Sequence, residues 1–221
     1  MSAVMPLPAT GSAVPLRGSR TARALLRLLG WRLDFAGLPA RQGVIVAYPH
    51  TSNWDFVLGM LAKWAIGVPL TFWGKHSLFR VPLFGAWLRW LGGVPVNRAA
   101  PGGIVGDMTR RMREAVADDR TLWLALAPEG SRKLGHGWRS GFYRVAVGAD
   151  VPLGLAYLDF AHRRVGVTTF LRLSGDEGVD MAAIAGHYAG VGGCRPAQAN
   201  PIRLDGSRAS AVTDITAGPR T

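Results

Sequence analysis

The sequence predicts a single α/β domain in which a mostly parallel central sheet is flanked by helices and carries an antiparallel hairpin at one edge. From residue 43 onward, short apolar runs alternate with segments of helical periodicity, the pattern of an α/β sheet covered on both faces. Two strand-like runs, 152–159 and 165–173, flank a polar turn at 161–164 and predict the hairpin. A length of 221 residues, 48% of them hydrophobic, suits one domain with a sizeable core.

The individual elements are predicted from the length and composition of each run. Strands are short and β-branched or continuously apolar, whereas helices are longer and have apolar residues three or four apart. The first pair is a strand at 43–48 and a helix at 53–66, with Ser52 or Asn53 as the helix N-cap. The remaining strands before the hairpin are expected at 68–73, 93–96 and 121–127, and the remaining helices at 80–91, 103–118, 140–149 and 179–189.

The two ends of the chain differ from this region. Residues 1–18 and 195–221 are rich in small residues and proline, so we expect a disordered leader and a loosely ordered tail around a domain at 37–194. Residues 19–36 contain a predicted basic amphipathic helix, at 20–33, with leucines on one broad face and arginines grouped elsewhere. Two interpretations are open: a helix lying in a membrane interface, or a terminal helix packed on the core with its arginines in water.

Charge and cysteine content narrow the classes of function. The formal net charge is +12, and Lys63, Lys75 and Lys133 are the only lysines, so nearly all the basic charge is arginine. This balance points to an anionic partner, and the spread of the arginines without a reading motif argues against nucleic acid. A single cysteine excludes an internal disulfide framework. The histidines lack metal-ligand spacing, and no apolar stretch is long enough to predict a transmembrane span.

A histidine and an aspartate follow the first predicted strand. His50 comes just after that strand, and Asp55 falls in the first turn of the next helix. On one continuous helix their side chains would stand about 140° apart, so a contact requires His50 in the loop and Asp55 reaching back. In that geometry Asp55 fixes the tautomer of His50 and stabilises its protonated form, which makes His50 a general base for a hydroxyl. The alternative is a helix cap beside an unrelated loop histidine.

A second polar group, Pro128-Glu129-Gly130-Ser131-Arg132-Lys133, follows the strand at 121–127. A carboxylate, a flexible glycine, a hydroxyl and cations can bind a polyol phosphate, with Arg132 on phosphate oxygens. Glu129 would accept from a hydroxyl or hold Arg132, and a charged surface turn is the alternative.

Two further cations also follow predicted strands. Lys75 and Arg98 are therefore expected at the same end of the sheet as His50 and Glu129. The aromatic helix between them either lines an apolar channel, faces a bilayer or belongs to the core.

Together these stretches resemble the glycerolipid acyltransferase family, the lysophosphatidate and glycerol-phosphate acyltransferases. That family has a His-x4-Asp motif, a block running from Lys to Arg, a Pro-Glu-Gly-Thr-Arg block and a later strand containing Pro. The chain has them in the same order, over about residues 43–160, as His50…Asp55, Lys75 to Arg98, Pro128-Glu129-Gly130-Ser131-Arg132 and Val151-Pro152-Leu153-Gly154-Leu155. It departs from the family at Pro49, where Asn is frequent, and at Ser131, where Thr is usual.

The resemblance implies a glycerol-phosphate acyltransferase-like fold and a direct acyl transfer. His50, oriented by Asp55, would take a proton from an acceptor hydroxyl that attacks an acyl thioester, with no covalent enzyme intermediate and with neither metal nor cofactor. The acceptor head group would contact Lys75, Arg98, Glu129, Gly130, Ser131 and Arg132. The implied acceptor is a lysophospholipid, foremost 1-acylglycerol-3-phosphate, and the donor is acyl-CoA or acyl-carrier protein.

A membrane lipid as product implies a peripheral protein on an anionic membrane surface, at the cytoplasmic face. Three other functions stay open. One is acylation of another lysolipid or an amino-acid lipid by the same mechanism, and another is a non-catalytic basic protein that binds membranes. The third is a hydrolase, in which His50 would activate water or a nucleophile.

Overall fold

The structure is a computed structural model, and it describes residues 4–8, 13–74, 76–95 and 103–206. The strands are β1 (Met5–Pro6), β2 (Arg32–Phe35), β3 (Gln42–Tyr48), β4 (Leu70–Gly74), β5 (Gly93–Pro95), β6 (Leu122–Leu126), β7 (Leu153–Asp159) and β8 (Arg164–Arg172). The helices are α1 (Arg20–Leu28), α2 (Asn53–Ile66), α3 (His76–Phe79), α4 (Phe84–Trp90), α5 (Gly103–Ala117), α6 (Gly141–Ala149) and α7 (Glu177–His187), followed by a 3-10 turn, η1 (Pro196–Gln198).

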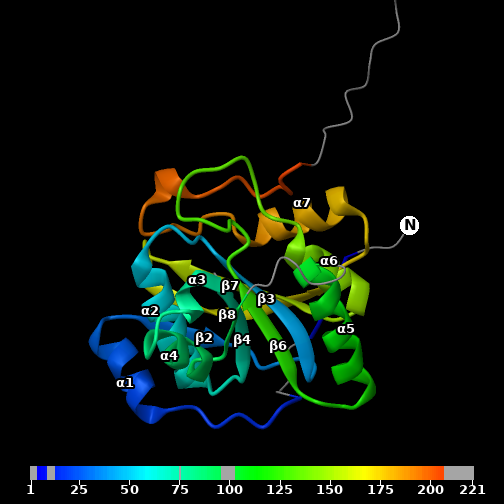
Figure 1. Cartoon of the computed structure of the whole chain (residues 1–221). Helices are drawn as coiled ribbons and strands as arrows, with labels where there is room; N and C mark the ends of the chain where they lie inside the picture. The colour runs from blue at the N-terminus through cyan, green and yellow to red at the C-terminus, as the bar shows by residue number, and fades with distance from the viewer. Residues whose placement is uncertain (1–3, 9–12, 75, 96–102, 207–221) are drawn as a thin grey trace, which may run out of the picture.

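Within the described residues, the eight strands form one sheet in the order β1-β8-β7-β3-β6-β4-β5, with β2 also paired to β8 (Figure 1). The pairings among β3, β4, β5, β6 and β7 are parallel, whereas β8 runs antiparallel to β7 and to β1. This confirms the predicted single α/β domain, its mostly parallel sheet and its antiparallel hairpin at one edge. Because β3 and β6 are parallel neighbours, in register from Gln42↔Leu122 to Val46↔Leu126, their carboxyl ends lie side by side.

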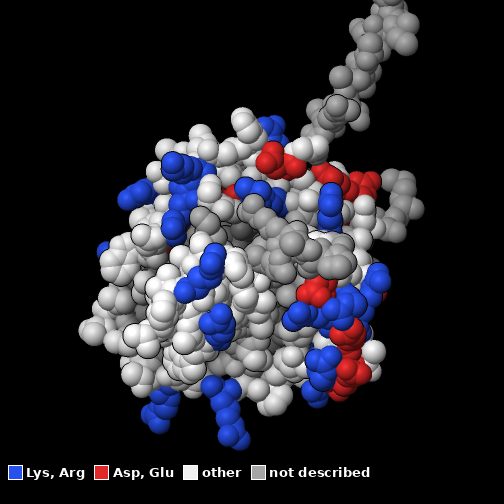
Figure 2. Space-filling view, in the orientation of Figure 1, with Lys and Arg blue, Asp and Glu red and all other residues white. Residues whose placement is uncertain are grey.

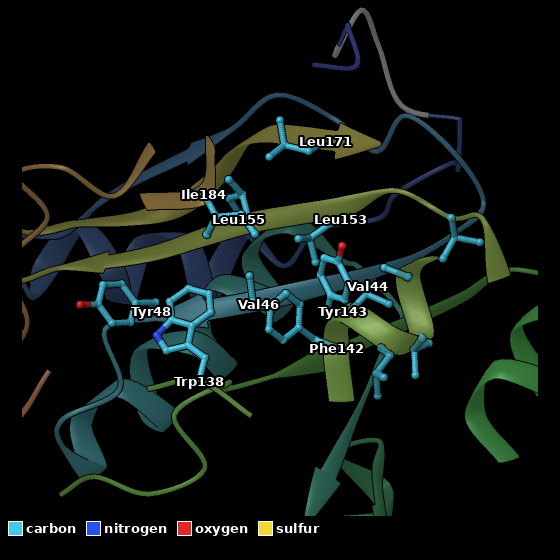
Figure 3. Packing of buried hydrophobic residues seen from close by; sticks show 14 of the residues in the cluster. Val44, Val46, Tyr48, Trp138, Phe142, Tyr143, Leu153, Leu155, Leu171 and Ile184 are labelled. Atoms are coloured by element: carbon cyan, nitrogen blue, oxygen red, sulfur yellow. The ribbon is translucent and has the colours of Figure 1, made fainter. Parts of the chain in front are cut away.

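Helices cover both faces of the sheet (Figure 1). Successive β3 side chains alternate between faces: Val44 and Val46 join the core formed with α5, α6 and α7, whereas Ile45 belongs to a core on the other face. Figure 3 shows the first of these cores, where β3 and β7 pack against α6 through Val44, Val46, Leu153, Leu155, Phe142 and Tyr143. On the other face, α1 and α2 share a cluster that contains Leu26 and Leu58.

The N-terminal region is packed more closely than its composition predicts. β1 pairs with β8 and Val14 is buried, so the prediction of a disordered leader is wrong for these segments of 1–18. The helix predicted at 20–33, in the segment 19–36, ends at Leu28. Gly30 then takes a left-handed φ of 74°, and β2 pairs with β8 instead of continuing the helix.

Two other predictions are corrected by local backbone chemistry and by long-range packing. The helix predicted at 80–91 begins only at Phe84, as α4, because Pro82 cannot continue a helix and Leu83 has φ 60°. The tail predicted to be loosely ordered from 195 is packed on the domain as far as 206. Leu204 is buried and forms a β-bridge with Trp138, which is itself fully buried. The packed unit therefore extends beyond the predicted domain boundary at 194.

Candidate functional site

The site lies at the carboxyl end of β3, where the chain turns into α2. Ser52 is the N-cap of α2, and its hydroxyl accepts a hydrogen bond from the backbone N–H of Trp54. Asp55 completes a capping box in the first turn, since its Oδ2 accepts from the N–H groups of Thr51 and Ser52 at 2.6 Å each. The loop backbone therefore fixes the position of the Asp55 carboxylate.

The same carboxylate oxygen faces His50. Asp55 Oδ2 lies 3.4 Å from His50 Nδ1, and the His50 side chain is 22% exposed, whereas that of Asp55 is 1% exposed. The structure thus brings the predicted pair together with His50 in the loop and Asp55 in the first helical turn. Because Nδ1 faces the carboxylate, Nε2 is the ring nitrogen left to exchange a proton with another molecule.

Burial sets the protonation of the pair. Burial lowers the pKa of His50 below its ordinary value, with Asp55 opposing the shift and the positive charge of Arg132 adding to it. Burial raises the pKa of Asp55, opposed first by the hydrogen bond from Ser52 and then by the charge of His50. At neutral pH the imidazole is therefore uncharged, which is the state that a general base requires.

Glu129, at the end of β6, ties two loops together. Its Oε2 accepts a hydrogen bond from the backbone N–H of His50 at 2.5 Å, and its Oε1 accepts from the N–H of Asn200 at 2.8 Å. The residue is only 4% exposed, and burial raises its pKa to about 7 against the opposing effect of these two bonds. Glu129 therefore holds the loop that carries His50 through the His50 backbone, where the sequence predicted contact with a hydroxyl or with Arg132.

The rest of the 128–133 block borders the same loop. Gly130 has a left-handed φ of 68°, and a Cβ there would stand 2.3 Å from Arg139 Nε, so a larger residue would displace Arg139. Ser131 and Arg132 are exposed, and the Ser131 hydroxyl bonds within its own turn, to Lys133. Arg132 is close enough to the His50–Asp55 pair for its charge to shift both pKa values.

The other two predicted cations, Lys75 and Arg98, lie outside the described residues. In the sequence, Lys75 comes directly after Gly74, the last residue of β4, and Arg98 comes three residues after Pro95, the last residue of β5.

An open groove of about 950 Å³ passes His50. One group of lining side chains is apolar and comes from α2, α3 and α4, namely Phe56, Val57, Leu78, Phe84, Trp87 and Leu88. The other is polar and comes from the loop after β6, namely Ser131, Arg132, Lys133 and Arg139. A smaller cavity of about 240 Å³ lies between α2 and the sheet, reaches His50 and Asp55, and is lined mainly by aliphatic and aromatic side chains. The His50 imidazole therefore stands where an apolar chain and an anionic head group could both be held.

Sequence reasoning missed the C-terminal segment 195–204, which forms hydrogen bonds with the loops of the site. The Asn200 side chain accepts from the N–H of Gly135 at 2.6 Å and donates to the carbonyl of Gly137 at 3.2 Å, while Arg195 N donates to Thr51 Oγ1 at 3.1 Å. Asn200 is 2% exposed. Its place next to Pro201 in a segment of low complexity gave no signal of this role, because every partner is more than sixty residues away in the chain.

Two properties of the described residues bear on cofactors and on membranes. No group of three or more His, Cys, Asp or Glu side chains in them could hold a metal ion. None of the helices described is both long enough and apolar enough to cross a bilayer.

Comparisons with known proteins add a family to this geometry. The sequence model of the Acyltransferase family matches residues 33–154, more than half of the chain. No curated protein matches it in sequence. Among solved structures, the crystal structure of the 1-acyl-sn-glycerophosphate (LPA) acyltransferase PlsC from Thermotoga maritima is similar, with 16% sequence identity and a TM-score of 0.44. That match covers 67% of this chain and 64% of the Thermotoga chain.

Proposed function

The chain belongs to the acyltransferase family, and we propose that it moves a fatty acyl group from acyl-CoA or acyl-carrier protein to the free hydroxyl of a lysophospholipid, foremost 1-acylglycerol-3-phosphate, in phospholipid biosynthesis. The observation that carries the proposal is the position of His50, backed by Asp55, on a groove with an apolar wall and a cationic wall. A lysophospholipid has two parts that match these walls, an apolar acyl chain and an anionic phosphate head group.

The proposed reaction begins with the neutral imidazole. His50 Nε2 accepts the proton of the acceptor hydroxyl as the oxygen attacks the thioester carbonyl, and Asp55 stabilises the imidazolium that forms. The tetrahedral intermediate then collapses, the C–S bond breaks, and the imidazolium returns the proton to the leaving thiolate. The products are an ester and a free thiol, and no enzyme nucleophile is needed.

Positioning supplies the rest of the catalysis. Arg132, together with Lys75 and Arg98, would hold the phosphate of the acceptor, and the exposed Ser131 hydroxyl and the Gly130 backbone border the same place. Glu129 would act indirectly, by fixing the loop that carries His50. The acyl chains would lie along the apolar wall, where Phe84 and Trp87 of α4 line the groove.

We also propose a peripheral location at the cytoplasmic face of a membrane, and the exposed part of helix α1 supports the membrane contact. Ala22 and Leu26 are buried against α2, so part of the apolar face packs on the core. Leu25, Leu28 and Leu29 remain exposed by 44%, 82% and 49%. Exposed leucines beside arginines on a short helix are typical of segments that lie in a lipid interface.

The test is acyl transfer from labelled acyl-CoA or acyl-carrier protein to a panel of lysophospholipids. We expect diacyl product from the wild type and a loss of about a thousandfold or more in kcat for His50→Ala. His162→Ala is the matched control, because His162 also pairs with an aspartate, at 2.7 Å from Asp159, but lines neither cavity that contains His50. Equal activity of wild type and His50→Ala would refute the mechanism, and free fatty acid without acceptor would indicate a hydrolase.

A further inference from the structure

Exposed apolar side chains gather on one part of the surface. Of the seventeen large apolar side chains that are exposed among the described residues, nine fall between residues 54 and 90. We define the α2–α4 face by the most exposed of them, Leu83 at 87%, Trp90 at 74% and Trp54 at 62%, together with Val81, Trp87 and Phe84. Aromatic contacts link its elements, since the rings of Trp64 on α2 and Trp90 on α4 lie 6.2 Å apart. Large apolar side chains that gather in this way on a protein surface mark an interaction site.

The fold displays this face at a cost to local conformation. Leu83, directly before α4, has φ 60° and ψ −52°, a backbone conformation that is unfavourable for leucine. Its side chain is nevertheless the most exposed of the large apolar side chains that the structure describes. Burial in the domain core therefore does not explain why an apolar residue occupies position 83.

The charged residues of the segment that supplies most of the face, 56–106, are all basic. No acidic residue occurs between Asp55 and Asp107, whereas this stretch holds two lysines and three arginines, of which Arg80 and Arg89 are described and exposed. Figure 2 shows the same asymmetry. The side of the molecule over α2 and α4 is white with isolated blue residues, whereas the red residues lie over α5 and at the top of the view, near α7. Positive charge flanking tryptophans complements an anionic lipid surface, where Trp prefers the headgroup level.

The face also adjoins the groove that contains His50. Trp87 and Phe84 belong to both the face and the groove. A molecule bound on the face is therefore next to the entrance of the groove. We propose that the α2–α4 face is a docking surface for an anionic lipid leaflet, which would place the mouth of the groove at the bilayer. The purpose of this docking, delivery of a membrane-embedded acceptor to His50, rests on the proposed function. The docking itself is measurable without it.

The test compares binding to vesicles of phosphatidylcholine with 30 mol% phosphatidylglycerol, by cosedimentation of the full-length protein. The double variant Leu83→Ser/Trp90→Ser removes two exposed side chains that do not line the groove. Val116→Ser/Val179→Ser, on α5 and α7, is the control for loss of exposed apolar area elsewhere. We expect the partition coefficient to fall roughly tenfold or more in the first double variant and to stay within about twofold in the control, with matching thermal melts.

Unchanged vesicle binding by Leu83→Ser/Trp90→Ser would overturn the proposal. So would a wild-type dimer that this variant converts to a monomer while vesicle binding persists, since a second copy would then cover the face. Activity separates this inference from the proposed function: the variant should keep transfer to a short-chain, water-soluble lysophospholipid and lose transfer to a long-chain acceptor in vesicles. If the wild type acylates neither acceptor, the proposed function fails, and the binding comparison still decides the docking.

Discussion

Glu129 makes the stability of this protein depend on pH in a direction opposite to that of an ordinary surface carboxylate. Its pKa is raised from 4.5 to about 7 in the folded chain because the carboxyl is buried between two loops. Between these values the folded state holds a proton that the unfolded state has released, so the free energy of unfolding falls as pH rises. The two pKa values correspond to a loss of about 2 to 3 kcal/mol between pH 5 and pH 8.

The assay is urea unfolding of wild type and Glu129→Gln at pH 5 and at pH 8. The variant is uncharged at both values, so the wild type should lose about 2 to 3 kcal/mol relative to it, a shift of roughly 1 M in the difference between their midpoints. Taking the difference between wild type and variant removes the contribution of His50 to the pH dependence, which has the opposite sign because the pKa of His50 is lowered. It also removes any pH-independent cost of replacing the carboxylate. Glu114→Gln, at an exposed position on α5, is the control and should show no such change. If the difference in unfolding free energy between wild type and Glu129→Gln is the same at both pH values, Glu129 is ionised throughout and the reasoning from burial is wrong.

Two further predictions concern the base and a helix end. The lowered pKa of His50 means that kcat/KM should stay constant as pH falls from 8 through neutrality and should decline, by at most tenfold per unit, only below the ordinary histidine pKa of about 6.5; a decline that begins above pH 7 would contradict the assignment of His50 as base. Gly67→Ala should lower the free energy of unfolding by about 1 to 3 kcal/mol, because Gly67 ends α2 with φ 84° and a Cβ would meet the backbone carbon of Arg17 at 2.5 Å. Gly106→Ala, inside α5 with no atom within 4 Å of the added Cβ, should raise it by about 0.5 to 1 kcal/mol, and urea unfolding that ranks the two variants the other way would refute this reading.

Local sequence signals predicted most of the fold because the deciding interactions are local. The helix start at Ser52 follows from a capping box within four residues, and the parallel strands follow from short apolar runs separated by helices. The errors fall where distant partners or single backbone angles decide. β2 forms because it pairs with β8, more than 130 residues later in the chain. α4 starts later than predicted because the backbone of Leu83 is not helical, with φ 60°.

The site divides in the same way. His50 and Asp55 are five residues apart, so the sequence could predict the arrangement that a contact requires, with His50 in the loop and Asp55 in the first helical turn. The role of Glu129 could not be predicted, because its two partners are backbone N–H groups at positions 50 and 200, which any residue except proline can supply. Composition even pointed the wrong way for Asn200, since proline and small residues around it suggested a loose tail.

The position of Asn200 bears on where the functional unit ends. The family match stops at residue 154, yet the carboxylate that holds the His50 backbone also needs the N–H of Asn200. Tyr48, at the end of β3, donates its hydroxyl proton to the Asn200 carbonyl at 3.1 Å, and Trp138 packs against the Tyr48 ring at a centroid distance of 5.1 Å. Removal of the C-terminal segment would therefore leave buried polar groups without partners at the carboxyl ends of both β3 and β6, where an unpaired group costs about 1 to 3 kcal/mol. The loop that carries His50 is thus held by two neighbouring parallel strands and by a segment outside the matched region, so family motifs alone do not define the set of residues on which the geometry at His50 depends.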